Sequence, residues 1–252
     1  MNEVVAKSAL DLLAAEIDVI WGPTRRAPEA PPSVVIGQAG RQLIIMVRDD
    51  LDPPTADRVV RIATEQGLPS GSAAIRELLE ASLGPVEATV GPGYDGRNPS
   101  PQPPPAIGRL IRSDQHDPVV DRLRTPITWE ADEWSDLLAG AYGPWAMIID
   151  GDRVLSICHC ARLAPEGVEA GTWTVDDSRG RGLAAAATAA WAETCRPLPG
   201  LVFYSTDINN RSSQQVAARL GLPLVGQLWK FRSANEGDGP LQARLRVVGR
   251  LC

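Results

Sequence analysis

The chain has 252 residues, a formal net charge of −6 and a sequence pI near 5.1, which argues against a nucleic-acid-binding surface and allows one or two buried cores. No apolar run reaches the length of a membrane span, and residues 1–20 carry four acids and one lysine, unlike the basic start of a signal peptide. Because four irregularly spaced cysteines are typical of free thiols in a reducing compartment, we expect a cytoplasmic protein that binds neither nucleic acid nor a membrane.

The pattern of residues 1–90 predicts an additional N-terminal α/β domain. Its expected elements are a helix over 3–20, a proline-rich loop over 22–32, strands over 33–36 and 42–47, and helices over 54–65 and 72–82. Ser72 is a suitable N-cap for the last helix, because a serine hydroxyl accepts from first-turn N–H groups. Since this part carries no phosphate loop and no catalytic cluster, we interpret it as a packing or substrate-shaping accessory domain. A diverged copy of the second domain is the alternative, although no sequence repeat supports it.

Residues 91–106 are rich in proline, a composition that disfavours helices and sheet interiors and favours an extended linker. Residues 107–252 predict a second α/β domain after this linker. Its early elements are expected to be strands over 145–149 and 154–160, a hairpin turn at 150–152 between them, and a strand over 169–174.

A Cys158-His159-Cys160 triplet lies within the second of these strands. Alternation along a strand puts both thiols on one face and His159 on the other. A tetrahedral zinc site would need more ligands from elsewhere, and the one other histidine is His116. Buried free cysteines commonly behave as small hydrophobes, so we predict core positions and no metal site.

The most informative stretch runs from Thr172 to Trp191. Its residues read as the end of a strand, a glycine-rich turn and an alanine-rich helix, and alanine is the strongest helix former. Such a turn can hold a phosphate group, because backbone N–H groups and the helix dipole both favour an anion. Arg179 and Arg181 add positive charge at the mouth of the turn.

Three phosphate-binding patterns compete for this turn. The P-loop is excluded, because the Gly-Lys-Ser/Thr tripeptide is missing from the sequence. Gly180, Gly182 and Ala185 satisfy the short G-x-G-x-x-A pattern, but a dinucleotide domain needs more strand–helix units downstream than the chain offers. The third pattern is Arg-x-x-Gly-x-Ala, formed by Arg179, Gly182 and Ala184.

The third pattern resembles the coenzyme A loop of the GNAT superfamily of N-acetyltransferases. The residues that follow extend the resemblance, since a strand over 201–206 precedes a helix that opens with Asn210 and ends at Leu220-Gly221-Leu222. The resemblance spans approximately residues 106–235. It implies an α/β fold with a mixed, mostly antiparallel sheet flanked by helices, and acetyl-CoA as co-substrate.

The resemblance also implies a set of residues that bind acetyl-CoA. They comprise backbone groups for the pantetheine arm (Trp173, Thr174 and Val175), the pyrophosphate loop (Arg179, Gly180, Arg181, Gly182, Leu183 and Ala184), and Asn210 with Ser213 beside it. Gly171 interrupts the strand before the loop, which supports a splayed strand with a gap for the arm.

In this family an amine attacks the thioester directly, and a base on the strand before the loop removes a proton. Glu169 is the first candidate for the base, and its alternative reading is a solvated carboxylate at a strand edge. His159 is the second candidate, because an imidazole titrates near neutral pH. Its alternative reading is a hydrogen-bonded core histidine.

One position departs from the family pattern. Where many members have a tyrosine that protonates the departing thiolate, this chain has Ala217, so Tyr204 or Ser213 would donate or the thiolate would leave unaided. We therefore hypothesise an N-acetyltransferase whose acceptor is an amine, expected to be a small molecule, with the N-termini and lysines of peptides or proteins as alternative acceptors. The alternative is a catalytically silent acyl-CoA-binding sensor or scaffold. The sequence carries no signal for the oligomeric state.

Overall fold

The computed structural model describes residues 7–22, 31–234 and 244–251, and the chain divides into two compact units. The first unit comprises Met1–Gly93, Thr206–Asn209 and Leu224–Cys252, and the second comprises Tyr94–Ser205 and Asn210–Pro223. The chain therefore returns to the first unit after Pro223, whereas the sequence analysis assigns residues 107–252 to one domain.

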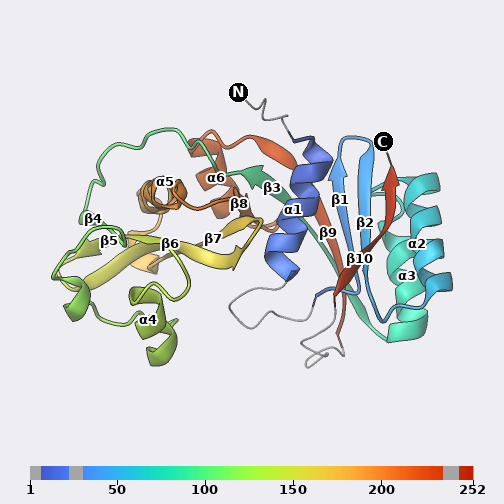
Figure 1. Cartoon of the computed structure of the whole chain (residues 1–252), viewed down its shortest axis with the longest axis horizontal. Coiled ribbons are helices and arrows are strands. Elements are labelled where there is room, and N and C mark those ends of the chain that lie inside the picture. Colours follow the sequence, from blue (N-terminus) through green and yellow to red (C-terminus); the bar gives the residue numbers. More distant parts are fainter. Residues whose placement is uncertain (1–6, 23–30, 235–243, 252) are drawn as a thin grey trace. The chain divides into compact units, whose positions relative to one another are not determined.

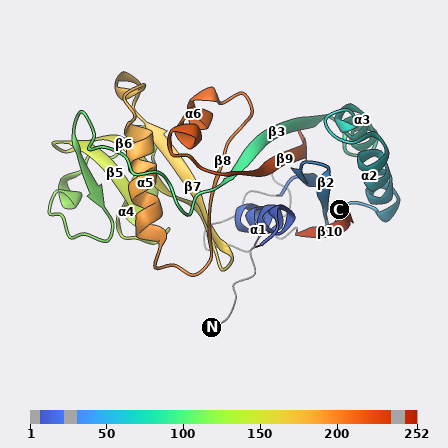
Figure 2. The same cartoon turned by 90° about the horizontal axis from the view of Figure 1, so that it is seen from above.

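The first unit is an α/β layer structure. Its elements are α1 (Ala9–Trp21), β1 (Val34–Ala39), β2 (Gln42–Arg48), α2 (Pro53–Gln66), α3 (Ser72–Leu83), β3 (Val86–Asp95), β9 (Leu224–Ser233) and β10 (Leu245–Leu251). Its strands lie in the order β10-β2-β1-β9-β3, and β1 pairs antiparallel with both β2 and β9. As Figures 1 and 2 show, α1 packs on one face of this sheet, and α2 and α3 pack on the other. This arrangement matches the additional α/β domain expected from the sequence, completed by two late strands.

The starts of α1 and α3 differ in how they are capped. Ser8 and Asp11 form a capping box, in which each backbone N–H donates to the other side chain at 3.2 Å, so α1 begins at Ala9. Residues 3–6 of the expected helix, and 23–30 of the expected loop, lie outside the described residues. The assignment of Ser72 as an N-cap is wrong. Gly71 caps α3 without a side chain, because the chain already turns there, with the Gly71 N–H donating to the Gly67 carbonyl at 2.8 Å.

The proline-rich stretch is only partly irregular, because β3 continues through its first residues to Asp95. Pro92 cannot donate a hydrogen bond, but its carbonyl accepts from the Thr206 N–H at 3.2 Å. Gly91 permits this close approach, since a Cβ there would lie 1.7 Å from the Thr206 carbonyl oxygen. The stretch expected to be a linker therefore begins as a strand.

The second unit holds the GNAT-like segment. Its elements are β4 (Arg109–Arg112), the 3-10 turn η1 (Val120–Arg122), α4 (Ala131–Leu138), β5 (Trp145–Asp150), β6 (Arg153–Ala164), β7 (Gly167–Thr174), the 3-10 turn η2 (Asp176–Ser178), α5 (Leu183–Cys195), β8 (Leu201–Ser205) and α6 (Arg211–Arg219). Strands β4 to β8 lie in chain order, antiparallel up to β7, whereas β7 and β8 are parallel. The mixed, mostly antiparallel sheet expected from the resemblance is confirmed.

Helices cover both faces of the β4–β7 sheet (Figure 1), with α5 on one side and α4 on the other. Trp191 of α5 is fully buried, and its indole N–H donates to the Pro144 carbonyl at 3.1 Å. Cys158 and Cys160 both pack beneath α5, on one shared face of β6, as alternation predicts. Among the described residues, no helix is both long and apolar enough to span a membrane.

Candidate functional site

Strands β7 and β8 pair only briefly before they separate. Their parallel pairing covers Gly167–Glu169 and Leu201–Phe203, whereas β7 continues to Thr174. Beyond Glu169, the edge of β7 that faced β8 is therefore released from this pairing. A released strand edge presents backbone N–H and C=O groups, which can bind an extended ligand.

Glu169 lies at the point where the two strands separate. One of its carboxylate oxygens (Oε1) accepts hydrogen bonds from both the backbone N–H and the hydroxyl of Ser205, each at 2.7 Å. The residue is only 6% exposed, so the solvated strand-edge reading is wrong. Because Ser205 is on β8 and Glu169 on β7, these bonds join the two strands just past their last backbone pair.

Beyond β7, the turn and the start of α5 form an anion-binding geometry. Gly180 and Gly182 have φ of +74° and +77°, a left-handed conformation that favours glycine. Gly182 is the N-cap of α5 and has no side chain with which to cap it. The first N–H groups of the helix therefore point out of its N-terminus, where the helix dipole adds partial positive charge.

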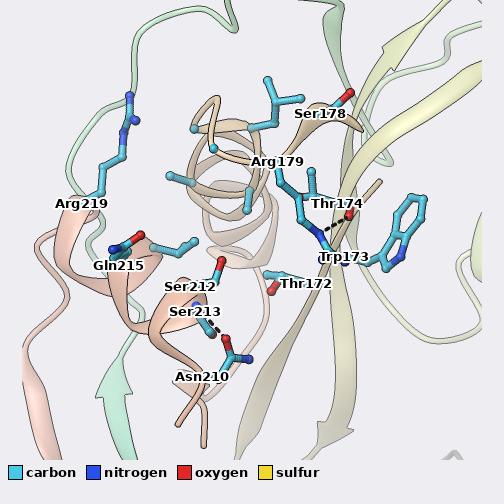
Figure 3. Close-up of a pocket in the computed structure, with 16 residues that line it drawn as sticks. Thr172, Trp173, Thr174, Ser178, Arg179, Asn210, Ser212, Ser213, Gln215 and Arg219 are labelled. Atoms are coloured by element: carbon cyan, nitrogen blue, oxygen red, sulfur yellow. Dashed lines mark hydrogen bonds between the residues drawn. The ribbon is translucent and has the colours of Figure 1, made fainter. Parts of the chain in front are cut away.

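These elements enclose a cavity of about 410 Å³. Figure 3 shows its side chains coming from β7 on one side and α6 on the other, with the start of α5 between them. Most of the cofactor-binding residues expected from the sequence line this cavity: Trp173, Thr174, Arg179, Gly180, Gly182, Leu183, Ala184, Asn210 and Ser213. The sequence and the fold thus bring the predicted loop and the predicted helix together around one space.

Val175 and Arg181 are the two predicted residues that do not line the cavity. The backbone N–H of Val175 donates to the Leu155 carbonyl at 2.9 Å, and the Val175 side chain packs in the core beneath α5. Arg181 is exposed. Val175 therefore contributes to the core, and Arg181 faces solvent.

The charged groups at the rim of the cavity also differ from the expected pair. Arg179 lines it, but its guanidinium lies 2.8 Å from the Asp176 carboxylate and donates to the Thr174 carbonyl at 3.2 Å. The second arginine of the rim is Arg219, at the end of α6. Figure 3 shows Arg179 and Arg219 on opposite sides of the start of α5.

Arg219 belongs to a helical face of which the sequence analysis identified only Ser213. The residues of α6 that line the cavity follow the i, i+1, i+3, i+4, i+7 pattern of one helix face: Ser212, Ser213, Gln215, Val216 and Arg219. Asn210 caps this helix, since its side chain accepts from the Ser213 N–H at 3.0 Å. The spacing counted back from the Leu220-Gly221 stop could have found this face.

Tyr204 lies just past the last paired residue of β8. Its hydroxyl is 2.7 Å from the Ser213 hydroxyl, and the residue is only 2% exposed. Burial raises the pKa of Tyr204 above its usual value, although hydrogen bonds with Ser213 and Thr172 oppose the shift. Ala217 is fully buried beside Tyr204 in a small apolar cluster, so its position offers no proton donor.

His159 lies on the opposite face of the sheet from the cysteines, as alternation predicts. Its ring packs edge-on against Trp129, with centroids 5.0 Å apart, and its backbone pairs with Gly171. A Cβ on Gly171 would lie 2.7 Å from the Nε2 atom of His159, so this glycine makes room for the imidazole. Neither His159 nor Glu169 lines the cavity. Within the described residues, no cluster of three or more His, Cys, Asp or Glu side chains could hold a metal ion.

The profile of a protein family, described as an acetyltransferase (GNAT) domain, matches residues 108–223. This chain carries a GNAT acetyltransferase domain. The matched residues contain β7, the glycine-rich turn, α5 and α6, which together form the cavity. GNAT acetyltransferases transfer an acyl group from acetyl-CoA.

Solved structures from several bacteria are similar to the chain at low sequence identity. A GCN5-related N-acetyltransferase from Kribbella flavida has 14% identity and a TM-score of 0.48, with 96% of this chain and 100% of that chain covered. A GNAT-family acetyltransferase from Colwellia psychrerythraea has 12% identity and a TM-score of 0.47, covering 90% and 97%. A GNAT-family protein from Novosphingobium aromaticivorans has 18% identity and a TM-score of 0.39, with 57% of this chain and 64% of that chain covered. No curated protein matches the chain.

Proposed function

We propose that this protein transfers the acetyl group of acetyl-CoA to the amine of a small molecule by direct attack. The observation that carries the proposal is the position of the cavity. It joins the released edge of β7 to the uncapped start of α5, so one continuous space offers backbone groups to an extended arm and N–H groups to phosphates.

The residues present suit the parts of coenzyme A. The turn from Arg179 to Ala184 has two glycines in the left-handed conformation and no capping side chain, which suits a pyrophosphate group. Strand residues Thr172 to Thr174 line the same cavity and suit the pantetheine arm. Acetyl-CoA supplies the activated acyl group, and the chain supplies its position and the proton transfers.

Two groups could remove the proton of the amine, and we propose Glu169 for this role. Glu169, Gly171 and Trp173 alternate along β7 and share one face of it, and His159 projects from β6 on the same face. The acceptor would therefore approach from the side of the sheet that α4 covers, opposite α5. His159 is the second candidate, because its ring lies against Gly171 and not deep in the core.

For the departing thiolate we propose Tyr204 as the proton donor. Burial keeps this phenol protonated, and its hydroxyl touches Ser213, which lines the cavity. A proton given up by Tyr204 would be replaced through Ser213 or solvent. In this proposal Tyr204 protonates the thiolate, a role that Ala217 cannot perform.

The apolar environment of Ala217 also favours a second function, that of an acyl-CoA-binding module without turnover. Calorimetric titration with acetyl-CoA, with NAD and NADP as controls, measures whether the protein binds acetyl-CoA specifically. Release of free thiol from acetyl-CoA, followed with a panel of small amines, then separates the enzyme from the sensor. Binding with amine-dependent thiol release supports the proposal, whereas binding without release from any amine supports the sensor.

Two variants test the proposed base. Glu169→Gln keeps an oxygen that can accept from Ser205 but removes the basic carboxylate, so turnover should fall with little change in acetyl-CoA affinity. His159→Asn is the matched comparison on the neighbouring strand. If Glu169→Gln turns over normally and His159→Asn does not, the base is His159.

A further inference from the structure

Arg219 lies directly over the turn that starts α5. A Cβ built on Gly182 would be 2.5 Å from the Nη1 atom of Arg219 and 2.8 Å from its Cζ atom, so the guanidinium occupies the space beside the N-cap. Arg219 also lines the cavity. Its side chain reaches the turn from the last residue of α6, a helix separate from the glycine-rich sequence.

Within the part of the chain that the structure describes, no carboxylate forms an ion pair with Arg219. Among the described residues, its hydrogen-bond partner is Gln102, whose neutral amide oxygen accepts from the Nε atom at 3.0 Å. Arg179, the other arginine of the rim, lies 2.8 Å from the Asp176 carboxylate. Because a neutral partner orients a guanidinium without cancelling its charge, the two terminal nitrogens of Arg219 remain available to an anion.

Gln102 is itself fixed by the segment that contains it. The backbone N–H of Ser100 donates to the Leu220 carbonyl at 2.7 Å, just past the end of α6. The prolines at 101 and 103–105 flank Gln102 and restrict the backbone there. The segment after β3 therefore lies along the end of α6 and holds the side chain that orients Arg219.

We propose that Arg219, oriented by Gln102, binds the pyrophosphate of the acyl donor and is the principal cation of this site. The proposal rests on the proposed use of a coenzyme A thioester. The pyrophosphate is the expected partner because the guanidinium lies over Gly182, where the first N–H groups of α5 emerge. Arginine suits this role, since its planar fork can grip two phosphate oxygens at once.

The test compares affinities for coenzyme A and for dephospho-coenzyme A, which keeps the pyrophosphate but lacks the 3′-phosphate. Arg219→Gln should weaken binding of both ligands by the same factor, about tenfold to hundredfold, because a charge-assisted hydrogen bond is lost. Its affinity should also depend less steeply on salt concentration than that of the unmodified protein. Arg211→Gln is the matched control, since Arg211 is exposed on the same helix outside the cavity and should bind normally.

Variants of Gln102 test the orientation separately. Gln102→Glu would place a carboxylate against Arg219 and should weaken coenzyme A binding although the arginine is kept. Gln102→Leu removes the restraint without adding charge, so its loss should be smaller. In the Arg219→Gln background, Gln102→Leu should have no further effect, because the group that it orients is gone.

The outcomes distinguish this proposal from the proposed function. If the folded, unmodified protein binds neither ligand, the use of coenzyme A fails and this assignment fails with it. If the protein binds coenzyme A and Arg219→Gln binds equally well, only the role of Arg219 is overturned. A loss confined to coenzyme A, with dephospho-coenzyme A unaffected, would overturn the pyrophosphate assignment in favour of the 3′-phosphate.

Discussion

Replacing Gly182 by alanine would test the geometry of the turn with a single methyl group. Gly182 has φ of +77°, where a Cβ costs about 1–2 kcal/mol, and this Cβ would also collide with the Arg219 guanidinium, 2.5 Å away. Gly140 is a matched control. It has φ of +78°, and nothing lies within 4 Å of its Cβ position, so Gly140→Ala carries the same backbone cost without the collision.

The two variants should therefore differ in ligand binding more than in stability. Both should lose about 1–2 kcal/mol of unfolding free energy, because the flexible arginine can move away at small cost. Displacing the guanidinium removes a charge-assisted contact worth about 1.5–3 kcal/mol, so acetyl-CoA affinity of Gly182→Ala should fall about tenfold to hundredfold.

Denaturant unfolding would measure the stability of the two variants, and calorimetric titration with acetyl-CoA would measure their affinities. Gly140→Ala should bind acetyl-CoA like the unmodified protein, because Gly140 lies outside the cavity. Equal acetyl-CoA affinities in the two folded variants would refute the reasoning that the space over Gly182 belongs to the ligand site.

Further substitutions probe the glycine-rich loop and the two strands beside it, β7 and β8. Gly182→Asp should abolish acetyl-CoA binding by placing a carboxylate at the phosphate position, and full affinity in a folded protein would contradict the loop assignment. Gly171→Ala should displace the His159 ring but spare both turnover and acetyl-CoA affinity, because Glu169 is kept; a fall in turnover at unchanged acetyl-CoA affinity would favour His159 over Glu169 as the base. Tyr204→Phe should slow thiol release from acetyl-CoA in the presence of an amine, without weakening acetyl-CoA binding. Because the folded-state pKa of Tyr204 is raised above 10.0, the folded state holds this proton longer, so stability should fall as the pH rises above about 10, and pH-dependent unfolding should lose this slope in Tyr204→Phe.

The sequence predicts those parts of the fold that local patterns determine. Alternation places Cys158 and Cys160 on one face and His159 on the other, and the alanine-rich run forms α5. The glycine-rich turn can be predicted from the sequence, because only glycine adopts the left-handed conformation easily. Gly180 and Gly182 both have this conformation.

What the sequence does not reveal depends on contacts between distant segments. Glu169 is buried because Ser205, from a strand further along the chain, supplies two donors to it. Arg219 lies over Gly182 because α6 brings it there, and neither residue signals the other in the sequence. The return of β9 to the first unit likewise follows from its pairing with β1, a long-range choice that local propensity does not encode.

The proline-rich segment has the composition of a spacer, and spacers usually tolerate insertions and deletions. Here Ser100 is hydrogen-bonded to Leu220, and Gln102 is hydrogen-bonded to Arg219. The number of residues between Asp95 and Gln102 therefore has to match the distance from the end of β3 to Arg219. Removing or adding one residue in that interval would shift Gln102 out of reach of the guanidinium. Variation in the length of this segment would therefore change donor affinity, and a series of single-residue insertions followed by coenzyme A titration would reveal it.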